Sequence, residues 1–204
     1  MLLSNICDII EEKGWYGMPK IDNMLKTMQK QGISDEIISQ FKRPKTKTPK
    51  PEDIVAFVEQ MDDMLSKEQC LSIMSEQGCY KTDRVSEKFR IFGELHKDKT
   101  LAERIALLPE LDSPHRVPCF INNDGTITLK FGSENEGFGC LCSTVKKLKS
   151  PIIPLTYCGC CGGHVKYTHE FALGVTLRLK EIVSSMATSD GEKPCEFIFE
   201  IDYS

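Results

Sequence analysis

The sequence predicts an α+β fold with a helical N-terminal half and an antiparallel sheet in the C-terminal half. Apolar residues recur at helical spacing as far as Leu107, and Ser66-Lys-Glu-Gln69 and Thr100-Leu-Ala-Glu103 are capping boxes that begin helices. After Pro118 the pattern changes to β-rich runs and alternating apolar and polar residues. Within the C-terminal half these patterns predict the order hairpin, helix, hairpin.

The predicted helices follow from apolar spacing and from residues that begin or end a helix. Ile21, Met24, Leu25 and Met28 share one face, and Gly32 ends that pattern. The other helices are expected at 35–41 with Ser34 as N-cap, at 52–65, at 66–74, at 84–95 and at 100–107.

The predicted strands lie on both sides of one more helix. Cys119–Phe131 is expected to form a hairpin around Asn-Asp-Gly. A helix is expected at 162–173, ended by Gly174. Val175–Val183 alternates, with Val175, Leu177, Leu179 and Val183 on one face, and the last strand runs from Cys195 to Ile201.

Three segments are expected along the chain. Residues 1–41 form an N-terminal helical segment, and residues 52–204 form an α+β domain with a cysteine-rich site in 138–204. Between them, 42–51 combines five basic residues with three prolines and no acid, which indicates an extended linker. A basic patch for an acidic partner or membrane surface is the alternative interpretation.

Composition limits the function classes. The formal charge of -4 argues against a dedicated nucleic-acid binder, and Met1–Trp15 resembles neither a signal peptide nor a membrane span. A cytoplasmic location is therefore expected, where the ten cysteines would be reduced. Metal binding or thiol chemistry is then favoured over disulfides.

The cysteines gather in the C-terminal half. Cys158, Cys160 and Cys161 lie among glycines just before His164, which we interpret as a sharply turning loop that carries ligands or reactive groups. Cys140 and Cys142 form a second pair, and Cys195 stands alone. Strand parity places Glu181 on the inward face beside Cys195, unless a bulge turns it to solvent. We expect these groups to meet at one metal site.

The segment from Cys158 to Ile201 resembles the C-terminal part of the 4-vinyl reductase domain family, which includes small-molecule sensors of bacterial regulators. The resemblance implies a zinc ion held by Cys158, Glu181 and Cys195, with Ser184 at the position of a third cysteine. Because serine is a poor zinc ligand, a further ligand would come from Cys160, Cys142 or Cys140. Bacterial proteins with the same paired Cys-x-Cys arrangement are also similar, as, more weakly, are aminothiazoline-carboxylate hydrolase-like proteins.

These features predict a small-molecule-binding, sensor-like domain with a structural zinc site, and a homodimer is possible by the same resemblance. The expected ligand contacts are Phe138, Tyr157, His164, Tyr167 and Phe171. One alternative is an enzyme, such as a small-molecule hydrolase, with Cys160 or Cys161 as a nucleophile activated by His164 or His169. A redox or iron–sulfur protein is a further alternative, although the cysteine spacing matches neither ferredoxin pattern.

Overall fold

The computed structural model describes residues 19–46, 48–78, 83–111, 118–131, 139–140, 142–148 and 153–203. The helices are α2 (Ile21–Lys30), α3 (Asp35–Gln40), α4 (Pro51–Met64), α5 (Lys67–Glu76), α6 (Asp83–Leu95), α7 (Leu101–Leu107) and α8 (Gly159–Leu173), with short 3-10 helices η1 (Leu108–Glu110), η2 (Val145–Lys147) and η3 (Leu155–Cys158). The strands are β1 (Cys119–Ile121), β2 (Ile127–Phe131), β3 (Thr176–Ser184) and β4 (Cys195–Asp202).

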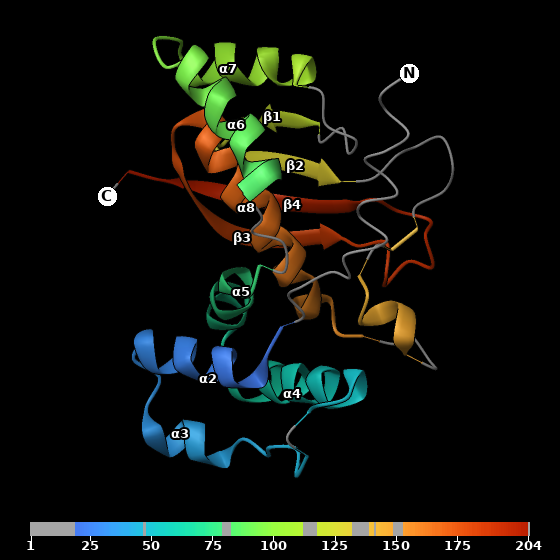
Figure 1. Cartoon of the computed structure of the whole chain (residues 1–204). Helices are drawn as coiled ribbons and strands as arrows, with labels where there is room; N and C mark the ends of the chain where they lie inside the picture. The colour runs from blue at the N-terminus through green and yellow to red at the C-terminus, as the bar shows by residue number, and fades with distance from the viewer. Residues whose placement is uncertain are drawn as a thin grey trace.

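The α+β class is confirmed. Four strands form one antiparallel sheet in the order β1-β2-β4-β3, and the chain passes through hairpin, helix and hairpin as expected (Figure 1). Helix capping is also as predicted. The hydroxyl of Ser34 accepts a hydrogen bond from the Ile37 amide, and both capping boxes, at Ser66 and at Thr100, are present.

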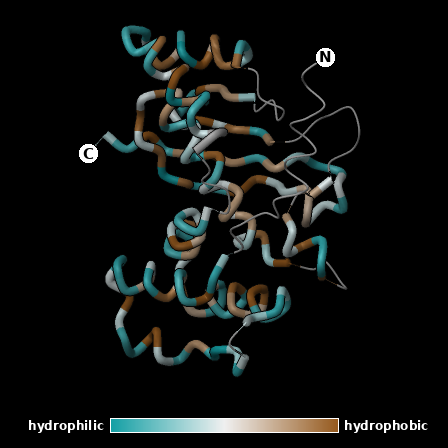
Figure 2. Tube along the Cα trace, in the orientation of Figure 1, coloured by the Kyte–Doolittle hydropathy of each residue, from teal (hydrophilic) through white to brown (hydrophobic). Residues whose placement is uncertain are grey.

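Helices α6 and α8 cover one face of the sheet, and α2 to α5 lie beyond one of its edges (Figure 1). The inward side chains of the strands, among them Leu129, Leu179, Phe197 and Phe199, are buried in the core. Figure 2 shows hydrophobic segments along the strands and also within the helices, including the group α2 to α4 at the bottom of the view. Within the described ranges, no helix is long and apolar enough to cross a bilayer.

The helix predicted at 162–173 is confirmed but begins earlier, at Gly159, so the prediction of a sharply turning loop around Cys158, Cys160 and Cys161 was wrong. Helix α8 begins at Gly159, and its glycines face neighbouring elements at very short range. A Cβ added at Gly163 would lie 1.8 Å from the Ser75 carbonyl oxygen of α5, and one at Gly159 would lie 2.8 Å from the Met74 Cβ. These positions lack side chains because α5 and α8 pack backbone to backbone.

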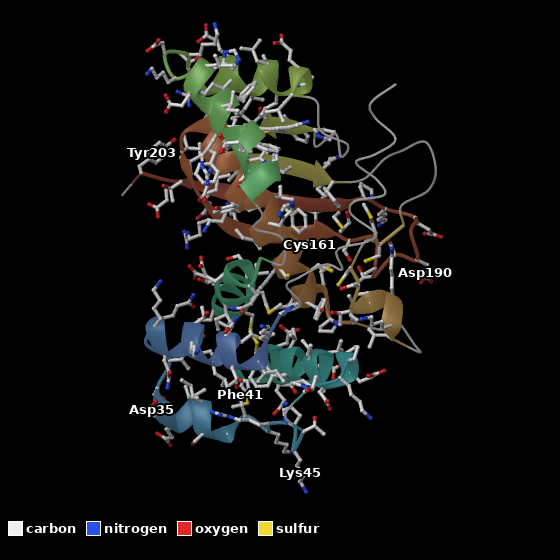
Figure 3. The ribbon with its side chains drawn as sticks, viewed as in Figure 1. Asp35, Phe41, Lys45, Cys161, Asp190 and Tyr203 are labelled. Atoms are coloured by element: carbon white, nitrogen blue, oxygen red, sulfur yellow. The ribbon has the colours of Figure 1, made fainter. Side chains whose placement is uncertain are left out.

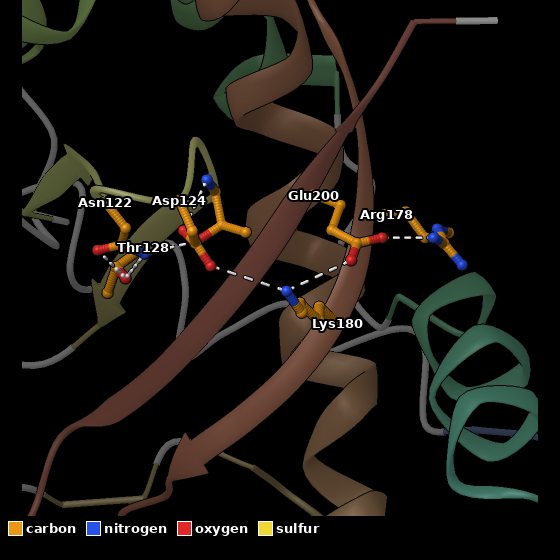
Figure 4. Close-up of polar contacts among 7 residues, drawn as sticks. Asn122, Asp124, Thr128, Arg178, Lys180 and Glu200 are labelled. Carbon is orange, nitrogen blue, oxygen red and sulfur yellow. Dashed lines mark hydrogen bonds and ion pairs between the residues drawn. The ribbon is translucent and has the colours of Figure 1, made fainter.

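The outer face of the sheet is polar and its charges are paired. Lys180 lies between Asp124 and Glu200, and Glu200 also pairs with Arg178 (Figure 4). In the adjacent hairpin, the Asn122 side-chain amide donates to the Thr126 and Thr128 hydroxyls. This face is exposed around Asp124, Arg178 and Lys180, whereas Thr128 is buried.

Two register shifts in β3 correct the predicted facing of Glu181 and Val183. The pairing with β4 shifts between Leu179 and Glu181 and again between Ile182 and Ser184. Leu179 and Ile182 are therefore both buried, while Val183 is 47% exposed. The Glu181 side chain is 45% exposed, and its carboxylate lies 3.9 Å from the Lys67 ammonium of α5. The inward placement of both side chains was wrong, because β-bulges change the side-chain parity of the strand.

The N-terminal helices pack as a group, which we call the helical unit (α2 to α5). The ring centroids of Phe41 and Phe57 are 5.1 Å apart, and the Lys42 amide donates to the Gln60 side chain of α4. The predicted linker lies between α3 and α4; its described residues before Pro51 form no helix or strand, and Pro51, its last residue, begins α4. Predictions for Met1–Trp15 lie outside the described residues.

Candidate functional site

Four of the predicted thiols lie in the same region of the fold, near the β3–β4 turn, although they are not arranged around one point as for a bound metal ion. Cys140, Cys142, Cys158 and Cys195 interact electrostatically, because Cys140 and Cys142 both raise the pKa of the other two thiols. We call these four residues the thiol cluster. Figure 3 shows several yellow sulfur atoms gathered near the turn that carries Asp190.

Three separate parts of the chain supply the thiol cluster. Cys140 and Cys142 precede η2, Cys158 ends η3 and is the N-cap of α8, and Cys195 begins β4. Cys158 and Cys195 are buried, and Cys140 and Cys142 are half-buried. The β2–β4 pairing sets Cys195 opposite Phe131, so the sheet register fixes the position of this ligand candidate. Cys195 raises the pKa of Cys158, so the two buried thiols lie in the same region, while their convergence on a metal ion stays a prediction.

The segment after β3 supplies hydrogen-bond donors to the buried sulfurs. Burial raises the pKa of Cys158, whereas a hydrogen bond from the Ser185 side chain opposes that shift. Burial likewise raises the pKa of Cys195 to about 11, and a hydrogen bond from the Met186 backbone amide opposes it. Ser185 is itself held in place, since its hydroxyl accepts a hydrogen bond from the Thr188 amide. Such donors favour the thiolate form that metal ions bind.

The hydroxyl groups of Tyr157 and Thr144 lie close to Cys142. The Tyr157 hydroxyl lies 3.8 Å from the Cys142 Sγ, and burial together with the charge of Cys142 raises the pKa of this tyrosine. The Thr144 hydroxyl lies beside Tyr157 but reaches no hydrogen-bond partner of acceptable geometry. Thr144 and Tyr157 therefore place two buried hydroxyl groups next to Cys142.

Two of the predicted metal ligands have other partners. The Cys160 thiol donates to the Gln77 carbonyl at 3.5 Å, at the end of α5. Glu181 pairs with Lys67 at the surface. At the position where the resemblance implied a further cysteine, the Ser184 hydroxyl donates to the Pro194 carbonyl at 2.7 Å. A donor set of Cys158, Glu181 and Cys195 does not describe this structure.

The donor chemistry of the thiol cluster fits a soft divalent cation such as zinc. Four cysteine sulfurs are one of the usual ligand sets of structural zinc, and the unsatisfied Thr144 hydroxyl and the donors to sulfur fit a thiolate centre. Among the described residues, however, no group of three or more histidine, cysteine or carboxylate side chains is arranged around one point as for a bound metal ion.

The residues predicted to contact a small molecule are spread over two places. Tyr157 is buried against the thiol cluster, whereas His164, Tyr167 and Phe171 are half-buried along α8. The Tyr167 and Phe171 rings meet edge to face with centroids 5.1 Å apart, and the Arg90 guanidinium lies 4.6 Å from the Phe171 centroid. Phe138 lies outside the described residues.

His169 is a buried neutral histidine between α6 and α8. Its Nδ1 lies 2.9 Å from the Val165 carbonyl, so this nitrogen carries the proton, and its ring lies 5.1 Å from that of Phe89. Burial lowers the pKa of His169 to about 4. This histidine is therefore a packing residue, and the structure does not bring it to the thiol cluster.

Stability is expected to fall as the pH drops from about 6.5 to about 4. In that interval the unfolded chain binds a proton at residue 169 that the native chain does not, so acid favours unfolding. The contribution of His169 amounts to about 3 kcal/mol. Urea unfolding of wild type and His169→Leu at pH 7 and pH 4 measures it. Between pH 7 and pH 4 the variant should lose about 3 kcal/mol less free energy of unfolding than the wild type. Equal losses in the two proteins would contradict the assignment of His169 as a buried neutral histidine.

Some residues of the site had no signal in the sequence. Ser185 acts through its hydroxyl and Met186 through its backbone amide. The positions of both groups depend on how the β3–β4 connection folds. Thr144 is notable only because it is buried without a partner. The Ser-Ser-Met-Ala-Thr-Ser run after β3 is the one pattern that could have indicated a hydrogen-bonded connection here.

Comparisons with known proteins give no family assignment. No protein-family model matches the sequence, and no curated protein matches it. The resemblance to 4-vinyl reductase domains therefore remains a prediction.

Similar solved structures include H-NOX proteins of Shewanella oneidensis at low scores. A crystal structure in the Fe(II)NO ligation state is 11% identical, covers 89% of this chain and 96% of that chain, and has a TM-score of 0.33. A solution structure of a histidine-to-glycine variant in the Fe(II)CO state is 12% identical, covers 90% and 98%, and has a TM-score of 0.32. Scores this low do not place the chain in that family.

Proposed function

We propose that this chain is a small-molecule-binding, sensor-like domain whose thiol cluster holds a structural zinc ion. The observation that supports the metal proposal is that Cys140 and Cys142 raise the pKa of both Cys158 and Cys195, so that thiols from three parts of the chain lie in one region. A zinc ion there would join the η2 segment, the start of α8 and the start of β4. That is the role of structural zinc, which links segments that packing alone holds weakly.

The surroundings of the thiol cluster support a cationic occupant. Without a cation the buried thiols stay protonated, and a protonated sulfur accepts hydrogen bonds only weakly. The donors Ser185 and the Met186 amide would then stabilise the site little. Cys158 is the N-cap of α8, so the dipole of this helix favours negative charge on the Cys158 sulfur. A bound divalent cation would deprotonate the thiols and make each of these contacts favourable.

The small-molecule part of the proposal rests on the aromatic residues of α8. His164, Tyr167 and Phe171 lie on one half-buried side of the helix, and Arg90 of α6 adds a cation over the Phe171 ring. Aromatic faces beside a fixed cation suit a small aromatic or anionic ligand. We expect the ligand to bind along this side of α8.

The enzyme alternative has less support from the geometry. A cysteine nucleophile needs a lowered pKa and a base within reach. The Cys160 thiol instead donates to a backbone carbonyl, and His169 is buried with its Nδ1 proton directed at Val165. Burial also raises rather than lowers the pKa of Cys158. No observation in the described residues favours nucleophilic catalysis over binding.

Cobalt substitution tests the proposed ligand set. Co²⁺ in a tetrahedral thiolate site absorbs intensely in the visible and near-ultraviolet ranges, and the intensity reports the number of thiolates. Metal-free protein should bind one Co²⁺ with the spectrum of four sulfur ligands, and Zn²⁺ should displace it. Cys142→Ser should give the weaker spectrum of a three-sulfur site.

Cys160→Ser is the matched control for the cobalt experiment. It also replaces a thiol of the Cys158–Cys161 segment, but its sulfur donates to the Gln77 carbonyl, and Cys160 is not one of the thiols that raise the pKa of Cys158 or Cys195. This variant should bind Co²⁺ with the wild-type spectrum. An unchanged spectrum for Cys142→Ser, or a reduced one for Cys160→Ser, would show that the ligand set is wrong.

A further inference from the structure

The connection between α3 and α4 carries several exposed cations and no acid. Residues 42–50 contain five basic residues, and the structure describes all of them except Lys47. The four described basic side chains are exposed and together form a surface that we call the basic connection: Lys42, Arg43, Lys45 and Lys50. Figure 3 shows Lys45 at the bottom of the view, directed away from the helical unit.

None of these four cations pairs with a carboxylate in the part of the chain that the structure describes. On the sheet, by contrast, Arg178 and Lys180 both pair with Glu200. Cations that lie this close along a chain repel one another. An anionic partner would relieve that repulsion, so the basic connection is complementary in charge to an acidic molecule.

Hydrogen bonds and packing fix the backbone of the basic connection at both ends. Phe41, which precedes it, is buried in the core. The Lys42 amide donates to the Gln60 side chain of α4 at 2.8 Å, and the Gln60 side-chain amide donates back to the Lys42 carbonyl at 3.4 Å. At the other end, the Lys50 amide donates to the Asp53 carboxylate at 2.7 Å. A backbone held in this way loses little conformational entropy when a ligand binds.

Acidic residues on both sides of the basic connection limit the shape of its partner. Asp35 and Glu36 lie in the first turn of α3, and Glu52 lies in the first turn of α4. Glu59 is exposed further along α4. A broad anionic surface would bring negative charge close to these carboxylates, and like charges repel. An extended peptide is narrow enough to contact the basic connection and avoid them.

The basic connection lacks the features that suit a membrane or a nucleic acid. None of the exposed large hydrophobic side chains of the described residues belongs to it, so it has no apolar group to insert into a bilayer. Phe41, the aromatic residue beside it, is buried and does not offer a face on which bases could stack. The formal charge of the whole chain is -4, which opposes attraction to a polyanion at long range.

We propose that the basic connection is a preformed docking surface for an acidic peptide segment of a partner protein, and that its hydrogen bonds to Gln60 hold it in shape. Carboxylates of the segment pair with the exposed cations. Arg43 suits this role because a guanidinium binds a carboxylate through two parallel hydrogen bonds. The surface belongs to the helical unit, and the proposal does not depend on the metal site.

A dye-labelled oligoglutamate peptide, titrated with the full chain and followed by fluorescence anisotropy, tests the proposal. The wild-type chain should bind this peptide and should not bind oligoglutamine of the same length. Binding should weaken from low to physiological ionic strength, where charges are screened over about 8 Å. Lys42→Gln/Arg43→Gln/Lys45→Gln removes three positive charges and should weaken binding by at least about 10-fold.

Two further variants separate the surface from the charge of the whole chain. Lys99→Gln/Lys146→Gln/Lys193→Gln is the matched control, because it removes three positive charges at exposed positions elsewhere. This control should bind the peptide about as tightly as wild type.

Gln60→Leu keeps every charge but removes both hydrogen bonds to Lys42. This variant should bind more weakly than wild type and more tightly than the variant of the basic connection.

The opposite results overturn the proposal. Equal weakening in the two triple variants would mean that the peptide responds only to net charge. Wild-type affinity in Gln60→Leu would show that the surface is not preformed. Binding to phosphatidylserine vesicles without binding to the peptide would identify a membrane surface as the partner. A wild-type chain that does not bind the peptide at low ionic strength would contradict the docking surface altogether.

Discussion

Gly163→Ala is expected to lower the free energy of unfolding by about 3 kcal/mol, the upper end of what overpacking usually costs. The new Cβ would lie 1.8 Å from the Ser75 carbonyl oxygen, which is backbone and cannot rotate away. At an exposed helical position the same change would stabilise the helix by about 1 kcal/mol. The sign of the effect therefore distinguishes close helix packing from a glycine that has no packing role.

Urea unfolding of three glycine variants measures this effect. A Cβ at Gly162 would lie 3.0 Å from the Leu179 Cδ2, a side-chain atom that can shift, so Gly162→Ala should cost less than Gly163→Ala. Gly139 has open space around it, and Gly139→Ala should change stability by less than about 0.5 kcal/mol. Wild-type stability for Gly163→Ala would mean that α5 and α8 are further apart than described.

Zinc is expected to stabilise the folded chain by about 2.7 kcal/mol when free zinc is 100 times its dissociation constant. For a chain of 204 residues this corresponds to a rise in melting temperature of about 5–11 °C. The gain comes from binding to the native state only, since the unfolded chain does not hold the thiols of three separate segments together. Thermal unfolding of metal-free protein, with and without added zinc, gives the value.

The zinc-induced shift in melting temperature, rather than stability itself, identifies the ligands. Cys158→Ser removes the buried ligand at the start of α8 and should abolish most of the shift. Cys160→Ser should keep it, because this thiol contacts Gln77. Equal shifts in both variants would contradict the assignment of Cys158. Since zinc must displace protons from the thiols, the shift should also shrink as the pH is lowered.

Local sequence signals predicted most of the fold. The capping boxes at Ser66 and Thr100 act within one turn of helix, so neighbouring residues determine them. Gly174 ends α8 in the left-handed conformation, which is a property of glycine itself. The alternation of Cys195, Phe197 and Phe199 set the facing of β4, because nothing interrupts that strand.

The failed predictions depended on tertiary structure. The glycines between Cys158 and His164 suggested a loop, but the close approach of Met74 and Ser75 explains them, and that approach has no local signal. Glu181 was placed inward by strand parity, and the register shifts beside it turned it towards Lys67. Strand parity is reliable only where the pairing register is continuous.

The metal site stays a prediction. Cysteine spacing indicated that the C-terminal thiols converge, and four of the predicted ligands lie in one region, where Cys140 and Cys142 raise the pKa of Cys158 and Cys195. The choice of Cys140 and Cys142 over Cys160 depends on the helical phase of α8, which directs the Cys160 thiol at α5. Spacing between cysteines could not distinguish a loop from a helix there, and the two place alternate thiols in different directions.

Elemental analysis of protein purified without chelator tests the central claim most directly. The wild-type chain should contain about one zinc per molecule, and Cys195→Ser should contain much less, below about 0.2 per molecule. Cys195 is the member of the thiol cluster that the β2–β4 register fixes in place. Wild-type protein that folds and contains less than about 0.2 metal ions per chain would contradict the claim that the thiol cluster is a metal site.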